Sequence, residues 1–429
     1  MIIYYICSII LLVPSTAYAY LDPGTGNILV YIVVSLIGAL VFSLKGIFYK
    51  IMGRKDIASS KNGSTESKSI VIFNEGKNYW NTFKPIVEAL IEMKRPFSYY
   101  TMDIEDPGLT IDYENDFMNK RYIGKGNIAY ARMGKLSADV VLSTTPNIGT
   151  EGFPLPRSPK IKHLSHVFHA VSDMCFYHKG SLDHYDSVML VGEFEIPILR
   201  KLENLRGLPP KELHPAGLPY VDVLASKVPA DVETDGKTIL IAPSWGTKGC
   251  LKLYGHKFIQ ELAEAGYEII IRPHPQSWKV ETEMLDKIKN DLKKYPNVKW
   301  DQDPDGTKSL SRSDIMISDT SSVRFDYVLL YKKPVITLES PMPDPEAFEM
   351  SDLKESVLEK TIAEAGITLN HETIGEIVPA VKSILDKTSS GHDLDGFRDK
   401  MIYNWGTSGK AIAQYLAGKA GELSETKEA

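Results

Sequence analysis

Short apolar runs alternate along most of the chain with longer stretches of helical, amphipathic periodicity. Residues 69–73, SIVIF, form such an apolar run, and residues 79–93 repeat apolar positions at helical spacing. The same alternation begins again with TILIAP at residues 238–243, after a polar stretch. Alternation of this kind is typical of parallel sheets covered by helices. The pattern therefore predicts an α/β fold with two doubly wound, Rossmann-like domains, residues 69–230 and residues 231–420.

The N-terminal part of the chain follows a different pattern, because it is mostly apolar. Residues 1–19 form an apolar, signal-like leader that ends near A-Y-A. Residues 28–48 carry no charge before Lys45, and their length predicts a transmembrane helix. A buried core helix is the alternative, but the segment shows no polar face. Residues 56–68 are polar and small, which predicts a flexible linker.

Charge next to the apolar segment predicts its orientation. Lys45, Lys50, Arg54 and Lys55 follow it directly. The positive-inside rule places this basic end in the cytoplasm. We therefore expect a protein of the cell (inner) membrane with its body on the cytoplasmic side.

Composition restricts the possible functions of the body. With 429 residues, 43% hydrophobic and 24% charged, the chain is long enough for two globular domains. Its net charge of −6 argues against a broad nucleic-acid-binding surface. The three cysteines are widely spaced and form no CxxC pair, so we expect a reducing compartment and no disulfide framework.

The strand-like run that ends in R-P-H-P contains the first candidate ligand site. Arg272 and His274 each precede a proline, which favours extended backbone and presents both side chains rigidly. Doubly wound sheets bind ligands beyond the carboxyl ends of such strands. Because an imidazole beside a guanidinium suits a phosphate, we expect Arg272 and His274 to bind one. The alternative is a turn in which His274 only caps neighbouring backbone.

A hydroxyl-rich turn is the second candidate. Asp319, Thr320, Ser321 and Ser322 lie between the apolar run DIMIS and an amphipathic stretch. A helix start carries unpaired N–H groups and partial positive charge, so it suits an anion. One hydroxyl is enough to cap a helix. Three in a row therefore favour a phosphate cradle, with Asp319 orienting the hydroxyls or binding a ribose hydroxyl, although capping alone remains possible.

A third candidate is the loop S-W-G-T-K-G, which begins with Ser244. Its glycines and small polar residues make backbone N–H groups accessible to a phosphate. The spacing of a P-loop is absent, so the position of the loop after a strand is the only support for Ser244 as a phosphate-binding residue.

Three histidines in K-H-L-S-H-V-F-H raise the question of a metal. His166 would point to the opposite face of a strand from His163 and His169, so a shared metal site would need a bend. We therefore expect no metal here. His169 comes last, at the end of the strand, where a general base would lie, and Asp173 is close enough in sequence to orient it.

Taken together, these motifs resemble the CDP-glycerol glycerophosphotransferase family of teichoic-acid polymerases and primases. The matching segments are P-H-P-Q at 273–276, S-D-T-S-S at 318–322, F-D-Y at 325–327 and K-P at 333–334. The resemblance extends over about residues 160–420. It implies the two-domain GT-B fold, in agreement with the alternating pattern.

The resemblance also implies an activity: transfer of glycerol phosphate from CDP-glycerol to an acceptor hydroxyl, with release of CMP and without a cofactor. His274 matches the donor-binding histidine of the family, and Thr320, Ser321 and Ser322 match its phosphate-contacting hydroxyls. His169 matches the second histidine, which would take the proton of the attacking hydroxyl. The segment F-H-A-V-S-D around His169 differs from the W-H-G-T-P-L-K of the family, which leaves the acceptor open.

The predicted function is thus a membrane-anchored transferase that adds glycerol phosphate, or a related polyol phosphate, to a cell-envelope glycan or lipid-linked acceptor. A GT-B glycosyltransferase that uses a nucleotide sugar is the main alternative, since the same cradle would hold its pyrophosphate. A sugar-nucleotide epimerase of the same fold fits the predicted membrane anchor less well. A non-catalytic membrane-tethered scaffold is a further alternative.

Overall fold

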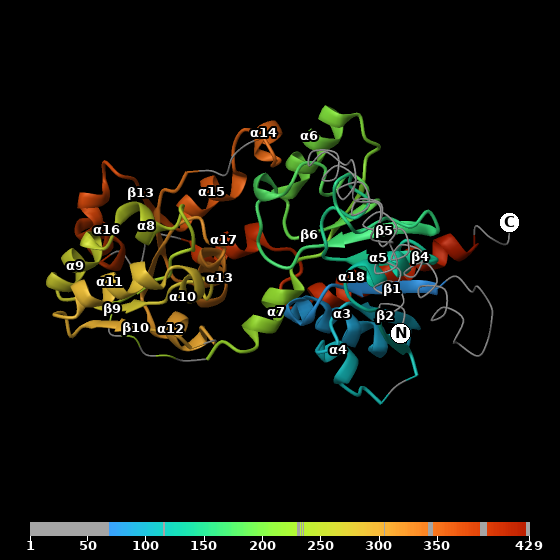
Figure 1. Ribbon diagram of the computed structural model, residues 1–429, viewed down its shortest axis with the longest axis horizontal. Helices are drawn as coiled ribbons and strands as arrows, with labels where there is room; N and C mark the ends of the chain where they lie inside the picture. Colours follow the sequence, from blue (N-terminus) through green and yellow to red (C-terminus); the bar gives the residue numbers. More distant parts are fainter. Residues whose placement is uncertain are drawn as a thin grey trace, which may run out of the picture. The chain divides into compact units, whose positions relative to one another are not determined.

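The computed structural model describes residues 68–425 apart from 115, 230–231, 233, 235, 304, 342–345 and 387–392. Within these residues the strands form one sheet of seven strands and one of six, in which every strand pair is parallel (Figure 1). The predicted α/β fold with two doubly wound parallel sheets is confirmed. We call the halves built on these sheets the first and second domain.

The first domain contains the seven-stranded sheet, with the order β3-β2-β1-β4-β5-β6-β7. Its strands are β1 (Lys68–Asn74), β2 (Phe97–Thr101), β3 (Met118–Tyr122), β4 (Ala138–Ser143), β5 (Ile161–Val167), β6 (Ser187–Leu190) and β7 (Glu212–Pro215). Its helices are η1 (Lys77–Tyr79), α3 (Trp80–Glu92), α4 (Pro107–Thr110), α5 (Asn127–Met133), η2 (Met174–Phe176), α6 (Glu195–Arg206) and α7 (Pro219–Ala225). The strand order reverses between β1 and β4.

The second domain contains the six-stranded sheet, with the order β10-β9-β8-β11-β12-β13 and a reversal between β8 and β11. Its strands are β8 (Thr238–Ile241), β9 (Glu268–Ile271), β10 (Val298–Trp300), β11 (Ile315–Ser318), β12 (Val335–Leu338) and β13 (Gly366–Leu369). The helices that follow β8 are α8 (Cys250–Tyr254), α9 (Lys257–Glu264), α10 (Ser277–Val280), α11 (Thr282–Leu292), α12 (Thr307–Arg312), α13 (Val323–Tyr331), α14 (Met350–Leu353), α15 (Val357–Ile362), η3 (Ala363–Ala365), η4 (Ile374–Glu376), α16 (Ile377–Asp386), α17 (Leu394–Met401) and α18 (Ser408–Glu425).

Burial on both faces explains why the central strands are continuous apolar runs. Every residue of β4, ADVVLS, and of β11, IMIS, is buried. Parallel sheets covered by helices on both sides have this composition, whereas half-exposed strands alternate apolar and polar residues. The helices show the complementary pattern. In α3 the buried residues Phe83, Ile86, Val87 and Leu90 recur at helical spacing and pack on the sheet.

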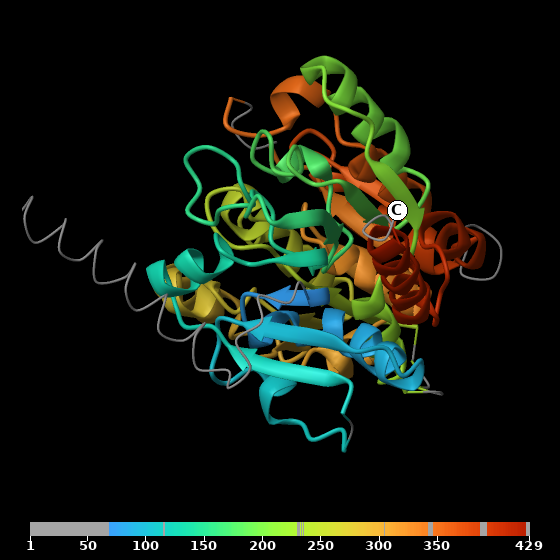
Figure 2. The same cartoon turned by 90° about the vertical axis from the view of Figure 1, so that its right-hand side faces the viewer.

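The last helix packs against the first domain, although the sequence pattern places residues 231–420 in the second. Helix α18 contacts α3, β1 and β4, and Figures 1 and 2 show it in red beside α3 in blue. Its buried Ile412, Ala413 and Leu416 join the apolar cluster of the first sheet. Periodicity identifies the apolar face of a helix but not the sheet that the face covers. Helix α18, which follows the second sheet in the sequence, therefore completes the apolar core of the first sheet.

No helix in the part of the chain that the structure describes is long and apolar enough to cross a bilayer. The predicted leader at 1–19 and the predicted transmembrane helix at 28–48 lie outside the described residues, as does the linker at 56–68 except for its last residue.

The contact between α18 and α3 predicts that Gly409 is required for stability. A Cβ at this position would lie 2.5 Å from Cβ and 2.6 Å from the carbonyl carbon of Pro85. Gly409→Ala should therefore lower the free energy of unfolding by about 1–3 kcal/mol, as overpacking does. Gly418, in the same helix, has open space at its Cβ and is the matched control. Gly418→Ala should stabilise the helix by up to about 1 kcal/mol. Equal urea midpoints for both variants would contradict this packing.

Candidate functional site

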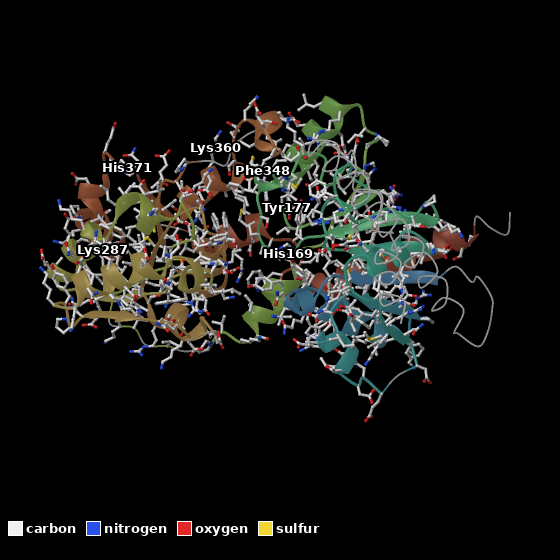
Figure 3. All side chains as sticks on the ribbon, viewed as in Figure 1. His169, Tyr177, Lys287, Phe348, Lys360 and His371 are labelled. Atoms are coloured by element: carbon white, nitrogen blue, oxygen red, sulfur yellow. The ribbon has the colours of Figure 1, made fainter. Side chains whose placement is uncertain are left out.

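Residues of both domains line a cavity of about 410 Å³. From the first domain they include His169 and Tyr177, which are labelled in Figure 3, and from the second they include Thr320 and Ser322. The predicted general base and two residues of the hydroxyl-rich turn therefore line one cavity. They are separated by about 150 residues in the sequence, and the fold brings them together at the carboxyl ends of β5 and β11.

His169 follows the end of β5 and is held by two neighbours. The hydroxyl of Thr144 lies 2.9 Å from Nδ1, and the ring of Tyr79 meets the imidazole edge-on at 4.9 Å between centroids. Burial lowers the pKa of His169 below the ordinary histidine value. The ring is therefore neutral near pH 7. With Nδ1 bonded to Thr144, Nε2 is the nitrogen left for a ligand.

Asp173 was expected to orient His169, but its carboxylate is used elsewhere. Oδ1 accepts a hydrogen bond from the backbone N–H of Cys175 at 2.9 Å. Oδ2 accepts one from the N–H of Leu358 at 3.0 Å and another from the hydroxyl of Ser356. Asp173 thus joins the first domain to the second, and Thr144 takes the orienting position. A residue four places away in sequence points elsewhere because the chain turns sharply after the strand.

The other two histidines of this strand have separate environments. His163 lies 2.9 Å from the hydroxyl of Ser187 and 3.1 Å from that of Tyr415. His166 is fully buried against the rings of Phe168 and Tyr185, and burial lowers its pKa to about 3. Among the described residues, no group of three or more His, Cys, Asp and Glu side chains is placed to hold a metal ion.

The hydroxyl-rich turn does not cap its own helix. Ser322 occupies the N-cap position of α13, yet its side chain makes no capping hydrogen bond. None of the hydroxyls of Thr320, Ser321 and Ser322 bonds to another residue in the described part of the chain. A helix start with three free hydroxyls suits a phosphate group. The geometry therefore favours the phosphate cradle over capping.

Asp319 has a structural place rather than one facing a ligand. Its side chain is fully buried and accepts hydrogen bonds from the N–H of Ser244 at 3.0 Å and from the N–H of Cys250 at 2.6 Å. These bonds fix both ends of the loop after β8. The carboxylate is thus not available to a ribose hydroxyl, and Ser244 is held beside the turn through its backbone.

Arg272 and His274 diverge in the structure, although they are two residues apart. Nη1 of Arg272 donates to Oδ2 of Asp301 at 2.6 Å, and both side chains are largely buried. The backbone of Gly306 packs on the guanidinium, since a Cβ there would lie 3.1 Å from Nε. The charge of Arg272 is therefore paired with Asp301. In this arrangement the guanidinium does not face a phosphate site as the sequence predicts.

His274, in contrast, is exposed at the strand end. The backbone N–H of Gln276 donates to its Nδ1 at 3.1 Å, which leaves the proton of the neutral ring on Nε2. Burial of part of the ring lowers its pKa, against the attraction of Glu281 and Asp319. The indole of Trp245 stacks on the imidazole at 6.3 Å. His274 is thus a fixed, neutral donor of one hydrogen bond.

Arg324 is a residue of this site that the sequence motifs do not single out. Its buried guanidinium donates from Nε to the carbonyl of Ser321 at 3.1 Å. It also donates from Nη1 to Thr337 and pairs with Glu359, which lines the cavity. Arg324 therefore fixes the backbone of the hydroxyl-rich turn. Its signal in the sequence is a basic residue in a helix start, VRFDYVLL, whose other residues apart from Asp326 are apolar or aromatic.

The missing capping bond predicts that Ser322 contributes little to stability. Ser322→Ala should leave the unfolding midpoint nearly unchanged. Ser356 is the matched control, because its hydroxyl accepts from the N–H of Glu359 at 3.0 Å and donates to Asp173. Ser356→Ala should cost about 1–2 kcal/mol, the usual contribution of a cap. Chemical denaturation compares the two, and a loss of similar size at Ser322 would show that its hydroxyl does cap α13.

Comparison with known proteins agrees with this arrangement. The family described as CDP-Glycerol:Poly(glycerophosphate) glycerophosphotransferase matches residues 178–412, more than half of the chain. A search of curated proteins found no match.

Among solved structures, a variant of the wall teichoic acid polymerase TagF soaked with CDPG is similar at 16% identity and a TM-score of 0.52, over 91% of this chain and 98% of that one. The UDP-GlcNAc 2-epimerase of Methanocaldococcus jannaschii is similar at 17% identity and a TM-score of 0.53, over 81% and 99% of the two chains. A putative UDP-N-acetylglucosamine 2-epimerase of Listeria monocytogenes has 14% identity and a TM-score of 0.54, over 83% and 98%.

These structural similarities, at low identity, show a shared two-domain fold of the GT-B type. The match to the family extends over the second domain and the end of the first, including the P-H-P-Q and S-D-T-S-S segments. The chain therefore belongs to the CDP-glycerol glycerophosphotransferase family and is an enzyme of that type.

Proposed function

We propose that this enzyme is a membrane-anchored transferase that moves glycerol phosphate, or a related polyol phosphate, from CDP-glycerol to a hydroxyl of a cell-envelope glycan or lipid-linked acceptor. One observation carries the proposal: His169, Thr320 and Ser322 line the same cavity. A neutral imidazole and an anion-binding turn in one cavity are the two parts that phosphoryl transfer to a hydroxyl needs. We infer CDP-glycerol as the donor from the family to which the chain belongs.

The second domain binds the phosphates of the donor. Nε2–H of His274 donates to a phosphate oxygen, and the hydroxyls of Thr320, Ser321 and Ser322 donate from the start of α13. The described residues that line the cavity include no lysine or arginine, and Arg272 is paired with Asp301. The phosphate charge is therefore stabilised by hydrogen-bond donors and the helix start rather than by a side-chain cation.

The chemical step then needs one proton acceptor. The acceptor hydroxyl attacks the phosphorus that carries glycerol, a new P–O bond forms, and the bond to the bridging pyrophosphate oxygen breaks. CMP leaves as an anion beside the turn at α13. Nε2 of His169 takes the proton of the hydroxyl, and Nδ1–H donates to the hydroxyl of Thr144 in this tautomer. Because burial lowers the pKa of His169, the base form is present at neutral pH.

A nucleotide-sugar glycosyltransferase is the second candidate function. Two proteins of similar fold are named as 2-epimerases of the nucleotide sugar UDP-GlcNAc, and a phosphate cradle would serve the pyrophosphate of either donor. The hydroxyl-rich turn could bind the phosphates of either donor, so its geometry does not distinguish the two candidate functions. Product analysis therefore decides between them.

We expect the purified enzyme to release CMP from CDP-glycerol and no UDP from UDP-sugars. His274→Ala should lower CMP release by about 100-fold, the usual effect of removing one donor from a charged transition state. His371 is the matched control, because it is exposed, stacks on Tyr254 and lies far from His169 in Figure 3. His371→Ala should retain full activity.

Release of UDP alone would replace the proposed donor by a nucleotide sugar. No nucleotide release from any donor would favour a non-catalytic, membrane-tethered scaffold. Full activity of His274→Ala would remove His274 from the donor site.

The proposed location is the cytoplasmic side of the cell (inner) membrane, where nucleotide donors are made. The apolar segment at 28–48 and the basic residues that follow it support this location. A green fluorescent protein fused after Lys55 should fluoresce, and alkaline phosphatase fused at the same place should be inactive. Phosphatase activity there would place the body outside the cytoplasm and would exclude a cytoplasmic nucleotide as donor.

A further inference from the structure

The strand order of the first sheet reverses between β1 and β4, and Glu75 lies directly beyond the end of β1. Crevices at such reversals are the usual ligand sites of doubly wound sheets. In the second sheet the corresponding reversal, between β8 and β11, holds the turn with Thr320 and Ser322. The first sheet therefore offers a second ligand position, and Glu75 is the charged residue there.

The carboxylate of Glu75 is only partly satisfied. Its Oε2 accepts a hydrogen bond from the hydroxyl of Thr145 at 2.9 Å. Among the described residues none bonds to Oε1, and no lysine or arginine pairs with the side chain. Burial raises the pKa of Glu75, against the hydrogen bond from Thr145. A half-buried carboxylate without a cation is costly for stability, so such groups gather at functional sites.

Glu75 and His169 are linked through neighbouring residues at the same end of the first sheet. Thr145, which holds Glu75, is the neighbour of Thr144, which holds Nδ1 of His169. The ring of Tyr79 contacts His169. Burial and the negative charge of Glu75 raise the pKa of the Tyr79 hydroxyl. Strands β1, β4 and β5 are neighbours in the sheet. The two residues thus follow strands that are about 10 Å apart, a separation that one small polyol can span.

We propose that Glu75 binds a second hydroxyl of the acceptor, on the carbon next to the hydroxyl that His169 deprotonates. Oε1 accepts a hydrogen bond from this second hydroxyl, while Thr145 holds Oε2. Glu75 takes no proton and forms no bond to phosphorus. The acceptor is accordingly a polyol with hydroxyls on adjacent carbons, such as a glycerol or sugar end. The assignment deepens the proposed function and rests on it.

Two alcohols test this assignment with CDP-glycerol as donor. The first is 1-O-octylglycerol, which has adjacent hydroxyls, and the second is 3-octyloxypropan-1-ol, which lacks the middle one. The wild-type enzyme should prefer the diol by about 10-fold or more in kcat/KM, the effect of a hydrogen bond to a charged group. Glu75→Gln should reduce the preference to less than about 3-fold, mainly through a higher KM for the diol.

Two controls separate binding of the acceptor from other effects. Hydrolysis of CDP-glycerol by water needs no second hydroxyl, so Glu75→Gln should lose far less of its rate with water than of its rate with the diol. Glu105→Gln removes an exposed carboxylate that pairs with Lys77, and it should keep the full preference for the diol. If Glu75→Gln does not fold, Thr145→Val leaves the carboxylate but releases it from its partner, and the same loss of preference is expected.

The assignment is overturned if wild type uses both alcohols equally, or neither of them. An unchanged preference in folded Glu75→Gln overturns it as well. In each of these cases continued release of CMP from CDP-glycerol leaves the proposed function intact. Failure of the proposed function is a different result, namely no CMP release with any acceptor or with water.

Discussion

The donor half of the site depends on one buried carboxylate, that of Asp319. Burying a carboxylate is costly unless it is hydrogen-bonded, and here the N–H groups of Ser244 and Cys250 satisfy it. The bonds join the end of β11 to both ends of the loop after β8, across the reversal of strand order. Because Thr320 follows Asp319 directly, the same bonds hold the hydroxyl-rich turn at its place. Asp319 is the only charged residue in the S-D-T-S-S motif, yet its role is to hold the loop and the turn in place and not to contact the donor.

The two halves of the site are joined by polar contacts and by an apolar cluster that contains buried residues of both domains. Asp173 of the first domain accepts hydrogen bonds from Ser356 and Leu358 of the second. Arg206 pairs with Glu349, and the rings of His178 and Phe348 stack. All of these contacts involve one segment of the second domain, residues 346–358. The hydrogen bonds of this segment therefore help to align His169 with the turn at α13, together with the shared apolar cluster.

Local patterns predicted the elements and the positions of the motifs, because apolar runs and strand ends are properties of short segments. They did not predict the partners of charged side chains. Asp301, which pairs with Arg272, lies 29 residues away in the sequence and is a neighbour only through the sheet. Glu75 belongs to no motif, and its place beside Thr145 follows from the strand order alone. The function of a charged residue is thus the hardest property to predict from a motif, since a buried charge pairs with a partner that the fold brings close.

The two histidines of the site illustrate how the fold assigns chemistry to like residues. Burial lowers the pKa of both His169 and His274, so both rings are neutral near pH 7. A backbone N–H can only donate, so the bond from Gln276 to Nδ1 leaves His274 with a proton on Nε2. A hydroxyl can also accept, so Thr144 permits the tautomer in which Nε2 of His169 is free of its proton. One imidazole is therefore arranged to donate to an anion and the other to accept a proton. The partner of Nδ1, rather than the histidine itself, makes the distinction.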